Sequence, residues 1–372
     1  MKRAGRWEEH CIWHEDNGVR DFCQGYFRSD NRRQVAFFTA GGFDPRTGQI
    51  PRLLAQHIGK QFLVFFLREE RDDKGEELLT IAKKNLSDLR NLFPDGQEWS
   101  IEIFDGTDRH VVGGRRLADR FKKTLPTLQH CTDVVLDLSA FSTGIIFTLT
   151  RLAWGLCRQS KSNLHILISY HPDYDARITS YNHDKATPIH GFHSPDEQDG
   201  DRNKARLWIP HFSPGKQKAI REIHKILKSV RELDICPALP FPAVDPRTAD
   251  EDAVKFIEEF QEWRIDARHI LHAAQDDPLD LYRQILAVHR AREQVFEGLQ
   301  DSQTILSPAG SKILSLGFLL AALDYDLPVM YVESVHYQLK SEAESSPVAK
   351  DSMKLFHLWL LGTPYPNNAD TV

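Results

Sequence analysis

Short apolar runs alternate with segments of helical periodicity along the first half of the chain. The runs are rich in β-branched and aromatic residues and predict strands, whereas the segments between them carry apolar residues every three or four positions and predict helices. Strands that alternate with helices in this way predict a parallel sheet covered on both faces. The predicted strands cover residues 35–39, 61–67, 99–104, 133–138 and 164–170.

The same order of elements begins again after a polar stretch. Residues 172–205 are rich in Asp, His, Pro and Asn and predict a long loop. The pattern as a whole predicts an α/β fold with two tandem Rossmann-like units, each a parallel five-stranded sheet flanked by helices. The predicted strands of the second unit cover residues 206–212, 233–241, 267–273, 303–306 and 329–332.

The spacing of landmarks indicates that the two units are copies in one register. Ser139 and Ser307 follow the fourth strand of their units and lie 168 residues apart, and Asp44 and Ser213 follow the first strands and lie 169 residues apart. The tetrapeptide Asp-Pro-Arg-Thr also occurs twice, at 44–47 and at 245–248. Its spacing of 201 residues would misalign the fourth strands of the two units. We interpret this repeated tetrapeptide as a coincidence or as a motif that both units use to begin a helix.

These observations predict the division of the chain into domains. The expected parts are an N-terminal segment without clear period at 1–33, a first Rossmann-like unit at 34–172, a loop or linker at 173–205, a second Rossmann-like unit at 206–335, and a C-terminal helix and tail at 336–372.

Composition narrows the class of protein. Of the 372 residues, 41% are hydrophobic and 27% are charged, as in globular proteins, and the odd number and irregular spacing of the five cysteines argue against a disulfide scaffold. No apolar run reaches the roughly 18–20 residues that cross a bilayer, and the start lacks the apolar core of a signal peptide. We therefore expect a cytoplasmic protein with no membrane partner. A formal charge of −6 gives no strong nucleic-acid signal and favours a small ligand or a protein partner.

Four loops at the ends of predicted strands are candidate ligand sites. In open parallel sheets, ligands bind outside the carboxyl ends of the strands, where helix N-termini offer free N–H groups to anions. Each loop also has a structural interpretation, as a capped turn with solvated side chains. The candidate ligand-binding residues are Gly41, Gly42, Asp44 and Arg46 in the first loop, Ser139, Ser142 and Thr143 in the second, Ser213 and Lys216 in the third, and Ser307, Gly310, Ser311 and Lys312 in the fourth.

The fourth loop gives the strongest prediction of an anionic ligand. Two hydroxyls, a glycine and a lysine stand together at one predicted helix N-terminus, beside an apolar strand. The loop is not a Walker A motif, because the upstream glycine and the Lys-Ser/Thr pair are missing, and this argues against an ATPase. In the first loop, Arg46 is a candidate to hold a phosphate through two parallel hydrogen bonds.

Signatures of catalysis and metal binding are weak. No Gly-x-Ser-x-Gly, His-Glu-x-x-His or paired Cys-x-x-Cys motif appears. The lack of a strong catalytic signature leaves open whether the chain is an enzyme and favours a protein that is not one. His10, Cys11, His14 and Cys23 do not have the spacing of a zinc finger, so we expect them to pack the N-terminal segment, and we predict neither a metal nor a cofactor. The histidines at 171, 183, 190 and 193 lie in the polar stretch or immediately before it and are expected to be solvated.

The fourth loop also carries a family resemblance. The sequence Ser-Pro-Ala-Gly-Ser-Lys-Ile-Leu-Ser-Leu at 307–316, followed by an apolar helix and a Pro-Val-Met-Tyr-Val strand, resembles the CRISPR-associated Rossmann-fold (CARF) sensor domains. In those domains a Thr/Ser-Gly-x-Lys-like turn after the fourth strand binds a signalling oligonucleotide. The resemblance therefore implies a nucleotide or cyclic oligonucleotide ligand at Ser307, Gly310, Ser311 and Lys312.

Two such units in one chain resemble the SAVED-type sensors of antiphage defence. Because such sensors act through an effector and none is visible in this chain, the resemblance implies a separate effector protein as a partner. The first unit departs from the pattern, since Gly144 stands at the position of Lys312.

Three hypotheses about function follow. The first is a nucleotide- or oligonucleotide-binding sensor or regulatory protein in bacterial antiphage defence. The second is a two-domain enzyme acting on a nucleotide or nucleotide-sugar, a glycosyltransferase or hydrolase, and the third is a scaffold subunit of a protein complex. An enzyme should have an acidic or His residue beside the glycine loops, whereas a sensor should present mainly Ser, Thr, Lys, Arg and backbone N–H groups there.

Overall fold

A computed structural model describes residues 4–28, 33–57, 62–71, 75–171, 178–196, 204–228, 233–298, 302–339 and 353–365. The chain divides into two compact units, each built from two stretches of sequence. The large-sheet unit comprises Cys11–Tyr181 and Ser334–Val372, and the small-sheet unit comprises Met1–His10 and Asn182–Glu333. Two strands, β9 (Ile178–Pro188) and β15 (Met330–Leu339), run across these boundaries in the chain and pair with each other.

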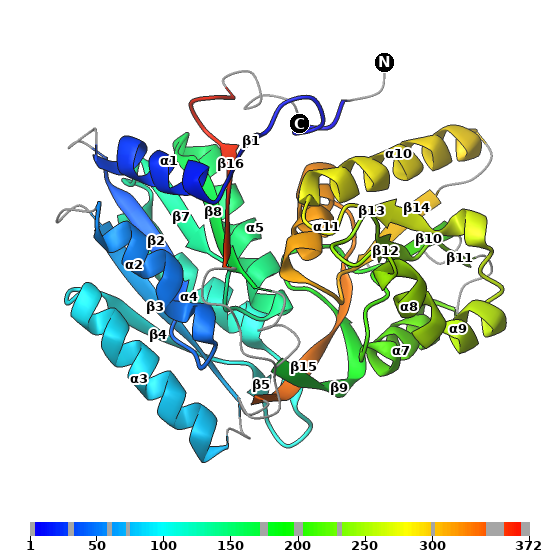
Figure 1. The fold of residues 1–372 in the computed structure, drawn as a ribbon, viewed down its shortest axis with the longest axis horizontal. Coiled ribbons are helices and arrows are strands. Elements are labelled where there is room, and N and C mark those ends of the chain that lie inside the picture. The colour runs from blue at the N-terminus through cyan, green and yellow to red at the C-terminus, as the bar shows by residue number, and fades with distance from the viewer. Residues whose placement is uncertain are drawn as a thin grey trace. The chain divides into compact units, whose positions relative to one another are not determined.

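The large-sheet unit is built on a seven-stranded sheet in the order β1-β16-β8-β7-β2-β3-β4 (Figure 1). Neighbours from β8 to β4 are parallel, whereas β16 is antiparallel to β8 and β1 is antiparallel to β16. The strands are β1 (Ile12–Glu15), β2 (Val35–Ala40), β3 (Phe62–Glu70), β4 (Gln97–Glu102), β7 (Asp133–Asp137), β8 (Asn163–Tyr170) and β16 (Lys354–Leu361), with a short hairpin of β5 (Phe104–Asp105) and β6 (His110–Val111).

Helices cover both faces of this sheet. Alternate residues of a strand point to opposite faces, so Phe37 packs in one core cluster with Leu86 and Leu89, while Phe38 stacks on Phe121 at 5.9 Å between ring centroids. Both phenylalanines are fully buried, which explains why the strand is a continuous apolar run. The helices are α1 (Asn17–Arg28), the 3₁₀ turn η1 (Pro45–Gly48), α2 (Gln49–Ala55), α3 (Glu76–Leu92), α4 (Gly113–Leu128) and α5 (Thr143–Ser160).

The small-sheet unit has shorter parallel strands. Its pairs are β10 with β11 and β14, and β12 with β13, and single parallel bridges join His211 to Ala238 and Leu306 to Val329. The strands are β10 (Ala205–Pro210), β11 (Leu233–Ile235), β12 (Ala238–Pro240), β13 (Leu271–Ala273) and β14 (Ser302–Ser307). The helices are α7 (Gln217–Leu227), α8 (Thr248–Lys255), α9 (Ile257–Glu262), η3 (Ala267–His269), α10 (Pro278–Phe296) and α11 (Lys312–Tyr325).

The mixed α/β class is confirmed, with a large, mostly parallel central sheet flanked by helices. The large sheet has seven strands rather than the five predicted, because β16 and β1 extend it in the antiparallel direction. No helix among the described residues is long and apolar enough to cross a membrane.

Three segments outside the expected units differ from the sequence predictions. The N-terminal segment contains β1 and α1, and the expected loop at 173–205 contains the eleven-residue β9. The expected C-terminal helix is wrong, because residues 354–361 form the strand β16, whose side chains are buried on both faces from Leu355 onward. A continuous apolar run suits a buried strand and a buried helix equally, and periodicity does not separate them.

Candidate functional site

The first two candidate loops lie side by side at the carboxyl edge of the large sheet, where a buried carboxylate joins their strands. Thr39 at the end of β2 donates its hydroxyl proton to Asp137 Oδ2 at 2.8 Å, and the Ser139 backbone N–H donates to Asp137 Oδ1 at 3.0 Å. The Ser139 hydroxyl also donates to Asp137 and accepts the backbone N–H of Ser169 in β8 at 2.8 Å. Ser139 is fully buried, and its hydroxyl and the Asp137 carboxylate together connect the ends of β2, β7 and β8.

The arginine of the first loop is occupied by its own neighbour. Asp44 caps η1 by accepting the backbone N–H of Arg46 at 2.9 Å, and it also accepts Arg46 Nε at 2.9 Å and Nη2 at 2.6 Å. Only 1% of Arg46 is exposed. The fork that we expected to hold a phosphate is therefore committed to a buried carboxylate. Gly42 remains open, since no heavy atom lies within 4 Å of the position that a β-carbon there would take, and its carbonyl accepts Asn85 Nδ2 at 2.9 Å.

The second loop meets a carboxylate of the same chain. The backbone N–H of Ser142, the N-cap of α5, donates to Glu69 Oε1 at 2.8 Å, and Glu69 Oε2 lies 2.7 Å from Arg71 Nη2. Glu69 thus occupies a position that favours anions at a helix N-terminus. Among the described residues, no hydrogen-bond partner is found for the buried Ser142 Oγ. Thr143, the first residue of α5, is partly buried beside it.

The third and fourth loops lie at the carboxyl edge of the small sheet. Their strands β10 and β14 are parallel neighbours, and beyond them the His211 backbone N–H donates to the Ser307 carbonyl at 3.0 Å. Ser307 is 1% exposed, and its hydroxyl accepts Trp208 Nε1 at 2.9 Å, so this predicted ligand residue has a packing role. Gly41, a predicted ligand residue of the large-sheet unit, also has a structural role. Its backbone N–H donates to the Leu67 carbonyl at 2.8 Å.

The N-terminus of α11 is built around a buried histidine. Ser311 caps the helix by accepting the Leu314 backbone N–H at 3.3 Å. A β-carbon on Gly310 would lie 1.9 Å from Cε1 and 2.1 Å from Nδ1 of His211, so only glycine fits against this ring. His211 is 3% exposed, and no hydrogen-bond partner of its Nδ1 is found among the described residues.

Burial also fixes the charge of this histidine. Removal from water lowers the pKa of His211 to about 4, which keeps the imidazole neutral at neutral pH. Sequence reasoning missed His211, although a histidine that ends an apolar strand immediately before a candidate loop is a usable signal.

Lys216 and Glu333 are charged groups at the carboxyl edge of the small sheet. Burial lowers the pKa of Lys216, which precedes α7, and the charge of Glu333 partly opposes that shift. Glu333, at the end of the small-sheet unit, is 4% exposed and accepts the Tyr331 hydroxyl at 3.1 Å. The Ser213 carbonyl accepts the Lys216 backbone N–H at 3.1 Å, which closes the third loop. Lys312 is the first residue of α11 and is partly buried.

The remaining candidate histidines and cysteines differ in how deeply they are buried. His171 and His183 are buried at 2% and 9% exposure, so the expectation that they are solvated is wrong, whereas His193 is exposed and lies 2.7 Å from Asp326. Cys23 belongs to the core of the large-sheet unit. No group of three or more potential metal ligands occurs among the described residues.

Comparison with known proteins adds no function. No protein-family model and no curated protein matches the chain. One similar solved structure is a human methyltransferase 10 domain containing protein, with 14% identity and a TM-score of 0.21, covering 44% of this chain and 72% of that one. Another is a functionally unknown protein from Pseudomonas aeruginosa PAO1, with 9% identity and a TM-score of 0.24, covering 81% of this chain and 92% of that one. Scores this low carry no argument about fold or activity.

Proposed function

We propose that the chain is a nucleotide- or oligonucleotide-binding sensor or regulatory protein, and that a phosphate of its ligand binds at the N-terminus of α11. The observation that carries this proposal is the His211 imidazole, which is buried against Gly310 with its Nδ1 unmatched among the described residues. A buried polar atom without a partner costs stability, which a ligand group at this place would offset.

The chemistry of the neighbouring groups favours an anion. The N-terminus of a fourteen-residue helix supplies backbone N–H groups and a partial positive charge. A phosphate near Lys216 would favour its ammonium form, which burial now disfavours. The corresponding places in the large-sheet unit are already filled, by Asp44 on Arg46 and by Glu69 on Ser142. The ligand-binding proposal therefore rests on the third and fourth loops.

We also propose that the two units are tandem copies of one five-stranded topology. In the large-sheet unit the parallel strands run in the order β4-β3-β2-β7-β8. In the small-sheet unit, β11 and β12 together take the place of β3, and the bridges of His211 and Leu306 connect the remaining strands into the corresponding order. The role in antiphage defence and the separate effector protein rest on the resemblance of residues 307–316 to the sensor domains.

One observation favours the enzyme alternative. His211 lies directly beside the glycine of the fourth loop, which is the feature expected of a catalytic site rather than a simple sensor. A neutral imidazole at a helix N-terminus can donate a hydrogen bond to a developing negative charge. The substrate in this alternative would be a nucleotide or nucleotide-sugar.

A thermal-shift screen of the full chain with nucleotides and cyclic oligonucleotides tests the proposal. A ligand at 100 times its dissociation constant stabilises the fold by about 2.7 kcal/mol. Lys216→Ala and Lys312→Ala should reduce that shift, whereas Lys218→Ala, an exposed lysine of α7, should leave it intact. If none of these compounds shifts the transition, the proposal is wrong. Phosphorus NMR of the bound mixture separates the alternatives, since only an enzyme converts its ligand.

A further inference from the structure

A buried carboxylate lies at the amino end of the large sheet, away from the candidate loops. Asp133 is the first residue of β7 and is fully buried. Burial opposes its ionisation, but hydrogen bonds from His165, Thr132 and Tyr26 outweigh that effect and lower the pKa of Asp133 to about 2. The group is therefore a carboxylate and accepts hydrogen bonds only.

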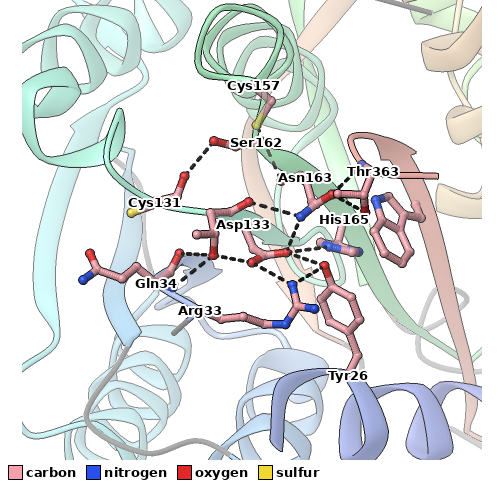
Figure 2. Close-up of polar contacts among 12 residues, drawn as sticks. Tyr26, Arg33, Gln34, Cys131, Asp133, Cys157, Ser162, Asn163, His165 and Thr363 are labelled. Carbon is pink, nitrogen blue, oxygen red and sulfur yellow. Dashed lines mark hydrogen bonds and ion pairs between the residues drawn. The ribbon is translucent and has the colours of Figure 1, made fainter. Parts of the chain in front are cut away.

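The partners of Asp133 come from several elements. Oδ1 accepts the Tyr26 hydroxyl at 2.7 Å, Asn163 Nδ2 at 2.9 Å and His165 Nε2 at 3.3 Å (Figure 2). Arg33 Nη1 lies 3.5 Å from Oδ2 and donates to the Tyr26 hydroxyl at 2.7 Å. The carboxylate thus connects α1 with the starts of β7 and β8.

A row of three histidines leads from this carboxylate to the edge strand. His165 Nδ1 lies 3.1 Å from His357 Nε2, and His357 Nδ1 lies 2.9 Å from His14 Nδ1. The residues belong to β8, β16 and β1, which are consecutive strands of the sheet. His165 and His357 are fully buried and His14 is partly exposed. Phe22 of α1 stacks on His357 at 4.0 Å between centroids and so covers the row.

The carboxylate dictates which nitrogen carries the proton on each ring. Because Asp133 can only accept, His165 must hold its proton on Nε2, and its Nδ1 is then an acceptor. His357 must therefore donate from Nε2 to His165, which leaves its Nδ1 as an acceptor. His14 must in turn donate from Nδ1, so its Nε2 is the basic nitrogen at the outer end.

The surroundings keep all three rings neutral at neutral pH. Burial lowers the pKa of His14, His165 and His357. His14 further lowers the pKa of the two inner rings, and His165 further lowers that of His357. Arg33 also lowers the pKa of His165, and Asp133 is the group that raises it. Burial, with the neighbouring Asp133, raises the pKa of Tyr26, so the tyrosine stays neutral.

We propose that His14, His357, His165 and Asp133 form a relay that takes up one proton at the outer end and stores it beside the buried carboxylate. A proton binds His14 Nε2, and the proton on His14 Nδ1 moves to His357 Nδ1. The proton on His357 Nε2 then moves to His165 Nδ1. The result is one imidazolium at His165 facing the Asp133 carboxylate, with His14 and His357 neutral in their other tautomers and no change in ring positions.

The relay makes the attachment of β1 and β16 sensitive to pH. The first proton forms an ion pair with Asp133 and keeps every hydrogen bond of the row. A second proton would add a second imidazolium to a row whose neighbouring rings lie 5.2 Å and 5.3 Å apart between centroids. Like charges in a buried site repel strongly, so further acidification should detach β16 and the edge strand β1 from β8.

Nitrogen NMR of the full chain with ¹⁵N-labelled histidine tests the relay. Spectra at pH 7.5 should show His14 as the Nδ1–H tautomer and His165 and His357 as Nε2–H tautomers, with resonances assigned by H14Q, H165Q and H357Q. On acidification, His165 should gain its second N–H while His14 changes tautomer at the same midpoint. If His14 is an Nε2–H tautomer at pH 7.5, or becomes an imidazolium while His165 stays neutral, the relay is overturned.

Two variants strengthen the test. H357F keeps an aromatic ring against Phe22 but interrupts the relay, so His14 and His165 should titrate with separate midpoints. D133N keeps an acceptor oxygen but removes the charge, so proton affinity at His165 should fall at least tenfold. H110Q, an exposed histidine of the same unit, is the matched control and should leave both midpoints unchanged. Midpoints in H357F and D133N equal to those of the wild type would contradict the proposal.

Discussion

The His211 imidazole fills the space in which a β-carbon on Gly310 would stand, at 1.9 Å from Cε1. This contact joins the end of β10 to the N-terminus of α11, because the buried ring lies directly against the glycine. Gly310→Ala should therefore displace His211, lower the free energy of unfolding by about 1–3 kcal/mol, and abolish any ligand-induced thermal shift.

A matched glycine and a double variant make that prediction specific. Gly25 in α1 has no heavy atom within 4 Å of its β-carbon position, so Gly25→Ala should be neutral or slightly stabilising. Combining His211→Ala with Gly310→Ala should recover part of the lost stability, as measured by urea unfolding. Equal losses for Gly25→Ala and Gly310→Ala would show that the ring contact has no energetic role.

Acid should destabilise the protein partly through His211. Burial lowers the pKa of the folded residue to about 4, below the value of about 6.5 in an unfolded chain, so the unfolded state binds the proton first as pH falls. The contribution of His211 to stability is complete above pH 6.5 and should decline by about 3 kcal/mol as the pH falls to 4. Urea unfolding at several pH values should show a flatter pH dependence for His211→Asn. Parallel curves for the two proteins would refute this.

The two Asp-Pro-Arg-Thr segments have the same hydrogen bonds but different burial, so they allow the effect of burial on an Asp–Arg pair to be measured. In both, the aspartate accepts the backbone N–H and the side chain of the arginine two residues later. Arg46 and Asp44 expose 1% and 8% of their side chains, whereas Arg247 and Asp245 expose 73% and 50%. Arg46→Ala should cost about 3–5 kcal/mol because it leaves a buried charge uncompensated.

Arg247→Ala is the control for that substitution. Its pair is exposed and screened by water, so the unfolding midpoint should not change measurably. The double variant with Asp44→Ala should lose less stability than the sum of the two single variants, since neither charge is then left alone. Additive losses in the cycle would mean that Arg46 acts through its packing and not through Asp44.

The parallel core could be predicted from sequence because its strands have a local signature. The strands β2, β7 and β8 are buried at every position and are bounded by polar turns, which separates them from the helices by length and β-branched content. The strand β16 is also a continuous apolar run, but it does not follow the alternation of strands and helices along the chain. Its sequence therefore does not distinguish a strand from a helix. The shared entry motif at 44–47 and 245–248 was also recognisable, because its hydrogen bonds are local.

The site was less predictable because its decisive contacts are distant in sequence. Glu69 reaches the N-terminus of α5 across 73 residues, and nothing near Ser142 indicates that a carboxylate fills that place. His211 was missed because its burial depends on Gly310, in a loop after another strand. By contrast, the pairing of Arg46 with Asp44 spans two residues, and capping preferences alone could have suggested that this arginine was not free.

The cysteines should differ sharply in reactivity. Burial raises the pKa of Cys23 to about 12 and the pKa values of Cys131 and Cys236 to about 11, and it also raises the pKa of Cys157, whereas Cys11 is partly exposed. The reactive species is the thiolate, and a thiol of pKa 11 is ionised to only about one part in a thousand at pH 8. A disulfide reagent such as DTNB should therefore modify one thiol of the native protein rapidly and all five in denaturant. Cys11→Ser should remove the rapid phase, and a rapid phase of two or more thiols would show that the structure around at least one buried cysteine opens readily.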